Sequence, residues 1–63
     1  MNKKNNHRFR ETEIRMQTSM LEIMKNIELK KITVKKICEK AGVNRSTFYA
    51  HFIDIYDMLD KMQ

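Results

Sequence analysis

Side chains that can donate hydrogen bonds are concentrated in one short stretch of this sequence. If Phe48 and Phe52 are buried one helical turn apart, six residues around them face outward: Arg45, Ser46, Thr47, Tyr49, Ala50 and His51. An arginine can bond O6 and N7 of guanine together, while hydroxyl and imidazole groups can donate to phosphate oxygens. No acidic residue lies between Glu39 and Asp54. The stretch therefore has the chemistry to bind duplex DNA.

A turn built around the only glycine separates two short predicted helices. Thr33 can cap the first helix, because its hydroxyl can accept from a free amide of the first turn. The apolar residues that follow recur at i, i+3, i+4 and i+7: Val34, Ile37, Cys38 and Ala41. Gly42 can supply the left-handed backbone that ends a helix, and Asn44 can cap the next helix, over about 44–51. Two short helices joined in this way indicate a helix-turn-helix, with an ordinary helical hairpin as the alternative.

Two further helices are expected to support this pair. From about Arg10 to Glu28, apolar residues recur at spacings of three and four: Met16, Met20, Ile23, Met24 and Ile27. Asp54 predicts the N-cap of a fourth helix, and Asp57 three residues later completes a capping-box pattern. We therefore expect an all-α domain over residues 10–63, of the small four-helix, homeodomain-like helix-turn-helix class, with a three-helix core and the start of a fourth helix. Residues 1–9 are polar and aperiodic and predict a flexible basic arm.

Size and charge support the same interpretation. The chain has 63 residues, with 13 basic and 8 acidic side chains and a net charge of +5. The basic surplus lies in residues 1–10 and 33–52, whereas residues 53–63 carry more acidic than basic groups. A polyanion would therefore meet the first two segments, with the C-terminal end turned away. A chain this short is also a poor candidate for an enzyme with an enclosed active site.

Chemistry other than binding finds little support in the residue pattern. Cys38 lies on an apolar face and is expected to be a small core residue, without a base to activate it. Neither His7 nor His51 has a second ligand at the spacing of a metal site. We expect no catalytic residue, no metal and no cofactor. Charges interrupt every apolar stretch, so we expect no membrane segment and a cytoplasmic protein.

The run Ala41-Gly42-Val43, followed by Thr47-Phe48-Tyr49-Ala50-His51-Phe52, resembles the N-terminal DNA-binding domain of the tetracycline-repressor (TetR) family. The resemblance covers about residues 10–63. It implies that the third helix enters the major groove and that the protein regulates transcription, as a repressor. It also implies site residues: Lys35 for a base edge or phosphate, Arg45 and Ser46 for bases, Thr47 and Tyr49 for phosphate or thymine methyls, and His51 for phosphate. Two positions depart from the family pattern, because Ile55 replaces a phosphate-binding lysine and Glu28 replaces a glycine at the end of the first helix.

The resemblance also implies partners beyond an operator in double-stranded DNA. Full-length relatives carry a C-terminal domain that forms a homodimer and binds a small-molecule effector, and residues 1–63 hold none of that domain. Two alternatives remain open from the residues alone. One is a protein–protein interaction module that presents the methionine-rich face of the first helix, and the other is a basic amphipathic peptide at a membrane surface.

Overall fold

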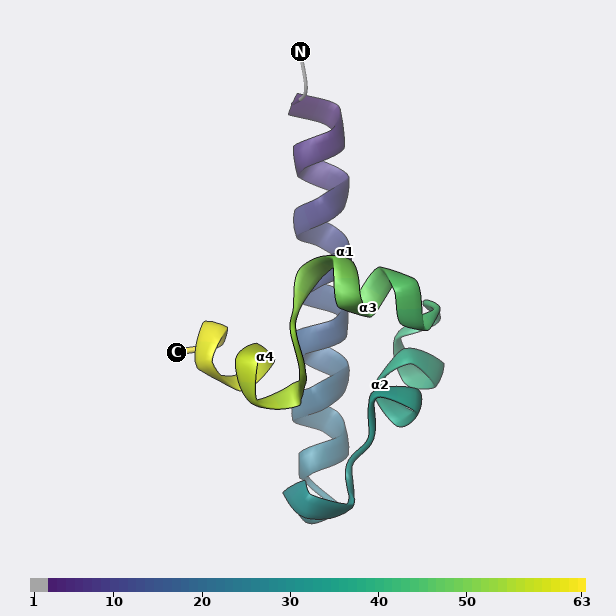
Figure 1. Ribbon diagram of the computed structural model, residues 1–63, viewed down its shortest axis with the longest axis vertical. Coiled ribbons are helices and arrows are strands. Elements are labelled where there is room, and N and C mark those ends of the chain that lie inside the picture. Colours follow the sequence, from purple (N-terminus) through teal and green to yellow (C-terminus); the bar gives the residue numbers. More distant parts are fainter. Residues whose placement is uncertain (1–2) are drawn as a thin grey trace.

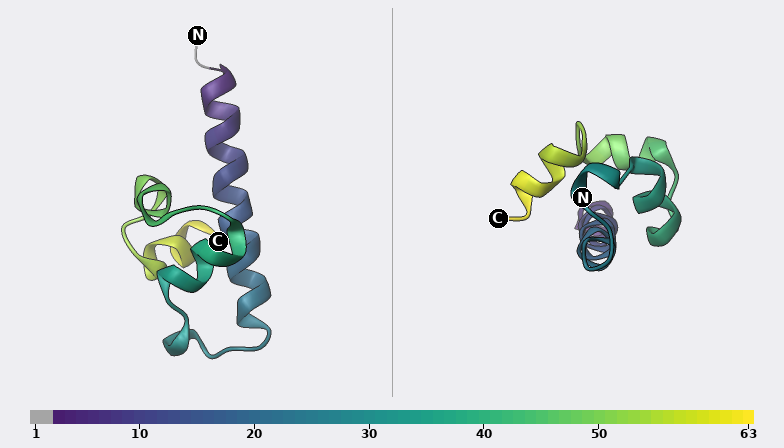
Figure 2. Two further views of the ribbon diagram at one scale, coloured as in Figure 1. Left: turned by 90° about the vertical axis from the view of Figure 1, so that its right-hand side faces the viewer. Right: turned by 90° about the horizontal axis from the view of Figure 1, so that it is seen from below.

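Three short helices pack on one side of a long first helix. The computed structural model describes residues 3–63 and contains α1 (Lys3–Met24), a 3-10 turn (Leu29–Lys31), α2 (Val34–Ala41), α3 (Arg45–His51) and α4 (Ile55–Lys61) (Figure 1). Seen along α1, the other helices all lie on one side of it (Figure 2). Residues 3–63 contain no strand, which confirms the expected all-α class.

The core lies where α2, α3 and α4 meet the C-terminal half of α1. Its buried residues are Met16, Met20, Ile23, Ile32, Ile37, Cys38, Ala41, Phe48, Phe52 and Met58. The predicted burial of Phe48, Phe52 and Cys38 is confirmed. Burial raises the pKa of the Cys38 thiol, and the positive charge of Arg45 opposes this shift. Cys38 therefore packs as a small apolar side chain, as expected.

The first helix starts earlier and ends earlier than its apolar spacing predicts. It begins at Lys3, so the expectation of an arm that stays outside the helix up to residue 9 is wrong for residues 3–9. This segment has no proline or glycine to interrupt a helix, and Phe9 packs its ring on His51 at a centroid distance of 3.7 Å. Residues 1–2 of the expected arm lie outside the described residues.

At the other end, α1 stops at Met24 instead of reaching Glu28. The amides of Lys25 and Asn26 bond carbonyls three residues back, at 3.2 and 3.0 Å, which tightens the last turn. The chain then turns so that Leu29 and Ile32 pack against the core. Met24, expected on the buried face, is 41% exposed.

The turn between α2 and α3 forms as its residues predict. Thr33 Oγ1 accepts from the Lys36 amide at 3.1 Å, and Asn44 Oδ1 accepts from the Thr47 amide at 2.9 Å. Gly42 adopts φ 75°, in the left-handed region, and its amide bonds the Cys38 carbonyl at 2.8 Å. The two predicted caps and the predicted glycine turn are confirmed.

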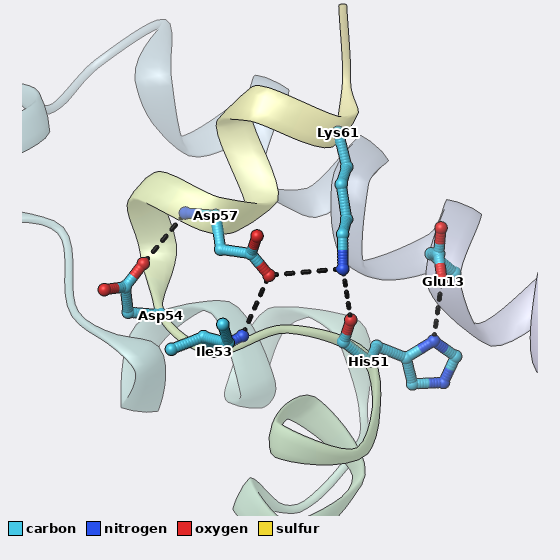
Figure 3. Close-up of polar contacts among 6 residues, drawn as sticks. All are labelled: Glu13, His51, Ile53, Asp54, Asp57 and Lys61. Atoms are coloured by element: carbon cyan, nitrogen blue, oxygen red, sulfur yellow. Dashed lines mark hydrogen bonds and ion pairs between the residues drawn. The ribbon is translucent and has the colours of Figure 1, made fainter.

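Two aspartates build the entry to α4. Asp54 Oδ1 accepts from the Asp57 amide at 2.8 Å, which confirms Asp54 as the N-cap. Asp57 Oδ2 reaches back to the amide of Ile53 at 2.9 Å, one residue earlier than in a standard capping box (Figure 3). The same carboxylate pairs with Lys61 Nζ at 3.3 Å. The bond from the Ile53 amide, followed by Lys61, lowers the pKa of Asp57 below its ordinary value of 3.8.

Gly42→Ala should lower the free energy of unfolding by about 1–2 kcal/mol, the cost of left-handed backbone for a residue with a Cβ. No atom lies within 4 Å of the place where that Cβ would stand, so the cost is conformational and not steric. Gly42→Asn should cost less, because asparagine tolerates this conformation. Urea unfolding followed by circular dichroism measures both variants. Equal stability of Gly42→Ala and the wild type would contradict a left-handed Gly42.

Asp57 should make folding sensitive to acid. Because its pKa is lower in the folded state, its stabilising effect is present above the ordinary titration range and is lost as the pH falls through the lowered pKa. Asp57→Asn should therefore flatten the dependence of thermal stability on pH between about pH 5 and pH 2. Asp60→Asn is the matched control, because Asp60 is exposed on the same helix. A wild-type acid dependence that survives in Asp57→Asn would rule out this role.

Candidate nucleic-acid interface

The outward face of α3 carries most of the predicted contact residues. Arg45, Ser46 and Tyr49 are exposed, Tyr49 to 54%, and Thr47 is half-buried. Arg45 and Tyr49 stand four residues apart on one side of α3. The Ser46 and Thr47 hydroxyls both bond Asn44 at the start of the helix. Full burial of Phe48 fixes the rotation of α3 about its axis and leaves the guanidinium of Arg45 and the phenol of Tyr49 exposed to solvent.

Asn44 organises the start of this surface. Its Oδ1 accepts from the Ser46 hydroxyl at 2.7 Å, the Thr47 amide at 2.9 Å and the Thr47 hydroxyl at 2.9 Å. Both hydroxyl protons thus point to Asn44, and the hydroxyl oxygens keep lone pairs that can accept from a base amino group. Donation to a phosphate by either hydroxyl would require its proton to leave Asn44.

The positive charge around α3 is not neutralised within the domain. Lys35, Lys36 and Lys40 of α2 are exposed, as is Arg45. Within the described part of the chain, the ion pairs use other basic residues, namely His7, Lys25, Lys30, His51 and Lys61. The charges beside α3 are therefore available to a polyanion, which strengthens the expectation for Lys35 and Arg45.

The expectation that His51 faces outward is wrong. Its residue is 8% exposed, and its ring is covered by Phe9, with an interplanar angle of 19°. His51 Nδ1 lies 3.0 Å from Glu13 Oε1, and its backbone carbonyl accepts from Lys61 Nζ at 3.4 Å (Figure 3). His51 follows Phe48 by three residues, so helical phase places it beside the buried side of α3, whereas the residues that contact its ring lie 38 positions or more earlier in the chain.

Phe9 and Glu13 were not among the residues expected at this interface. The two residues are four positions apart and thus share one face of α1. Phe9 lies in the segment that was expected to be an arm, and Glu13 lies in the turn after it. An aromatic and a carboxylate at that spacing were the available signal for a histidine partner.

The two departures from the family pattern are also visible: Ile55 packs against the core, and Glu28 is exposed after the end of α1.

Neither a metal-binding cluster nor a membrane-spanning helix is found among the described residues. No group of three or more His, Cys, Asp or Glu side chains within them is placed to hold a metal ion. None of their helices is long and apolar enough to cross a membrane.

Comparison with known proteins agrees with this geometry. The family model described as bacterial regulatory proteins, tetR family, matches residues 21–62, from the end of α1 through α4. No curated protein and no solved structure matches the chain. Since the match covers more than half of the chain and includes α2, the glycine turn and α3 entire, this protein belongs to the tetR family of bacterial regulatory proteins, which are DNA-binding transcription regulators with a helix-turn-helix.

Proposed function

We propose that this chain binds duplex DNA in a sequence-specific manner, with α3 in the major groove, and represses transcription from an operator. The observation that carries the proposal is the outward face of α3, where Arg45 and Tyr49 are exposed and none of the ion pairs of the described residues reaches Arg45. Such a face offers donors to bases and phosphates without a competing carboxylate.

Each exposed residue has a role that its chemistry suits. Arg45 and Ser46, in the first turn of α3, read base edges, the arginine most favourably at a guanine. Thr47 and Tyr49 contact phosphates or thymine methyl groups, and Lys35 at the start of α2 contacts a phosphate or a base edge. The phosphate contacts place α3 in register, and Arg45 supplies most of the discrimination between sequences.

In its full-length form we propose a homodimer that reads a two-fold symmetric operator, one half-site per chain. Two such recognition helices would lie about 34–36 Å apart, one turn of the DNA helix. A small-molecule effector would act through a C-terminal domain outside residues 1–63. Membership of the tetR family supports both proposals.

The protein–protein interaction module is the weaker candidate. It requires the methionine-rich face of α1 to be free, yet Met16 and Met20 are both fully buried in the core. That face is therefore already used to hold α2, α3 and α4.

Binding to DNA should depend strongly on salt. Three to five phosphate contacts per half-site predict a slope of log K against log salt concentration of about −3 to −4.5. Fluorescence anisotropy with a labelled duplex, obtained by selection from random sequences, measures this slope at several salt concentrations. An affinity that stays constant across those concentrations would exclude the proposed interface.

Arg45→Ala should flatten the preference at one base pair of the half-site, at a cost of about 1–3 kcal/mol there. Lys40→Ala is the matched control, because it removes one positive charge from α2 and should weaken all sequences equally. Selection from random duplexes, repeated with each variant, reports the preference at every position. An unchanged profile for Arg45→Ala would show that this residue reads no base.

A further inference from the structure

His51 is the residue at which three helices meet. Its side chain bonds Glu13 of α1 at 3.0 Å and stacks on Phe9 of α1, while its carbonyl accepts from Lys61 of α4. His51 itself ends α3, the proposed recognition helix. Side chains of α1 therefore hold the ring of His51, and a side chain of α4 holds its backbone.

The contact with Glu13 decides where the ring carries a proton. An ionised carboxylate can only accept, so the hydrogen bond at 3.0 Å requires a proton on Nδ1. Phe9 covers the face of the ring, and none of the groups described in the structure bonds Nε2. Figure 3 shows this second nitrogen pointing away from Glu13. No fully buried side-chain nitrogen or oxygen of the described residues lacks a hydrogen-bond partner, so the unpartnered Nε2 reaches the surface. Nε2 is therefore the ring atom left for a partner outside the fold.

A DNA phosphate fits the place of His51 at the end of α3. In helix-turn-helix proteins the N-terminal residues of the recognition helix contact base edges, and in the homeodomain variant the C-terminal end of that helix contacts the DNA backbone. A phosphate diester is also an acceptor only. With Glu13 on one nitrogen and a phosphate on the other, both nitrogens must carry protons, and the ring must be an imidazolium.

We propose that Glu13 is a positioning residue for DNA binding, which holds the Nδ1–H of His51 inward so that the ring donates Nε2–H to a backbone phosphate only after it takes up a proton. The inference rests on the proposed function. In the neutral ring with its proton on Nδ1, the Nε2 lone pair would face the phosphate oxygen. Both atoms are then acceptors, and no proton lies between them to form a hydrogen bond. DNA binding therefore draws one proton from solvent, and its affinity rises as the pH falls.

The other charged groups around the ring do not replace Glu13. Lys61 of α4 approaches the His51 carbonyl at 3.4 Å, but it is paired with Asp57 at 3.3 Å. These two charges largely compensate each other. Glu13 of α1 is thus the charged side chain that contacts the imidazole itself, at 31% exposure against 3% for the histidine.

The test measures the affinity for the selected duplex between about pH 6 and pH 8, the range around the ordinary histidine titration, at constant salt. The wild type should bind about tenfold more tightly at the acid end, since uptake of one proton changes the affinity by up to tenfold per pH unit. Glu13→Gln is the decisive variant. A glutamine amide can donate to Nδ1 and leave the proton of the neutral ring on Nε2. Its affinity should therefore be independent of pH and, at pH 8, tighter than that of the wild type.

A purely structural role of Glu13 predicts the opposite, a loss of affinity in Glu13→Gln at every pH. His51→Gln should bind weakly and without pH dependence. His7→Gln is the matched control, because it removes the only other histidine, which is exposed and paired with Glu11, and should keep the wild-type profile. Thermal melts verify that each variant is folded.

Calorimetry of the wild type in two buffers with different heats of ionisation counts the protons taken up on binding, and it needs no variant. Uptake near one proton at about pH 8 supports the proposal. Zero uptake, or a pH dependence that persists in Glu13→Gln, would overturn it while leaving sequence-specific DNA binding intact. Failure of every variant and of the wild type to prefer any duplex would instead overturn the proposed function, and this inference with it.

Discussion

Burial of Phe48 and Phe52 is the interaction on which the rest of the structure depends. The two rings lie 5.4 Å apart and are 0% and 2% exposed, packed among the methionines of α1 and the apolar face of α2. Burial of an aromatic side chain contributes about 1.5–3 kcal/mol, a large share for so small a core. Burial of Phe48 sets the rotation of α3 about its axis, and at this rotation Arg45 and Tyr49 are exposed. The contact that holds α3 in the fold therefore leaves these polar side chains available for the proposed DNA contact.

Polar N-cap residues add to the stability that the small core provides. Helices of seven or eight residues are too short to persist alone in water, so their ends need partners. Thr33, Asn44 and Asp54 each satisfy an amide in the first turn of a helix. Asn44 does more, because the Ser46 and Thr47 hydroxyls converge on it and are held at the face that would meet DNA. Asn44 thus stabilises the start of α3 and also fixes two side chains of the proposed interface.

The N-terminal half of α1 lies outside the helix-turn-helix, yet its side chains contact the end of α3. Phe9 and Glu13 contact His51 from one side, and Lys61 reaches its carbonyl from the other. The end of α3 is thereby fixed by side chains of α1 and α4. Because the residue that bonds His51 is the carboxylate Glu13, the proposed DNA contact requires a positively charged imidazole, which α3 by itself would not require.

The sequence by itself determined the helix-turn-helix, because its signals are local. Thr33, Gly42 and Asn44 act on backbone within about one turn of themselves, so their positions predict both ends of α2 and the start of α3 correctly. Periodicity likewise identified Phe48 as buried and Arg45 as exposed. Only the tertiary structure decided the start of α1 and the partners of His51, which are Phe9 and Glu13. The physical reason is that a helix without a stop signal extends until packing or solvent limits it, and that both partners of His51 lie 38 or more residues before it, beyond any local period.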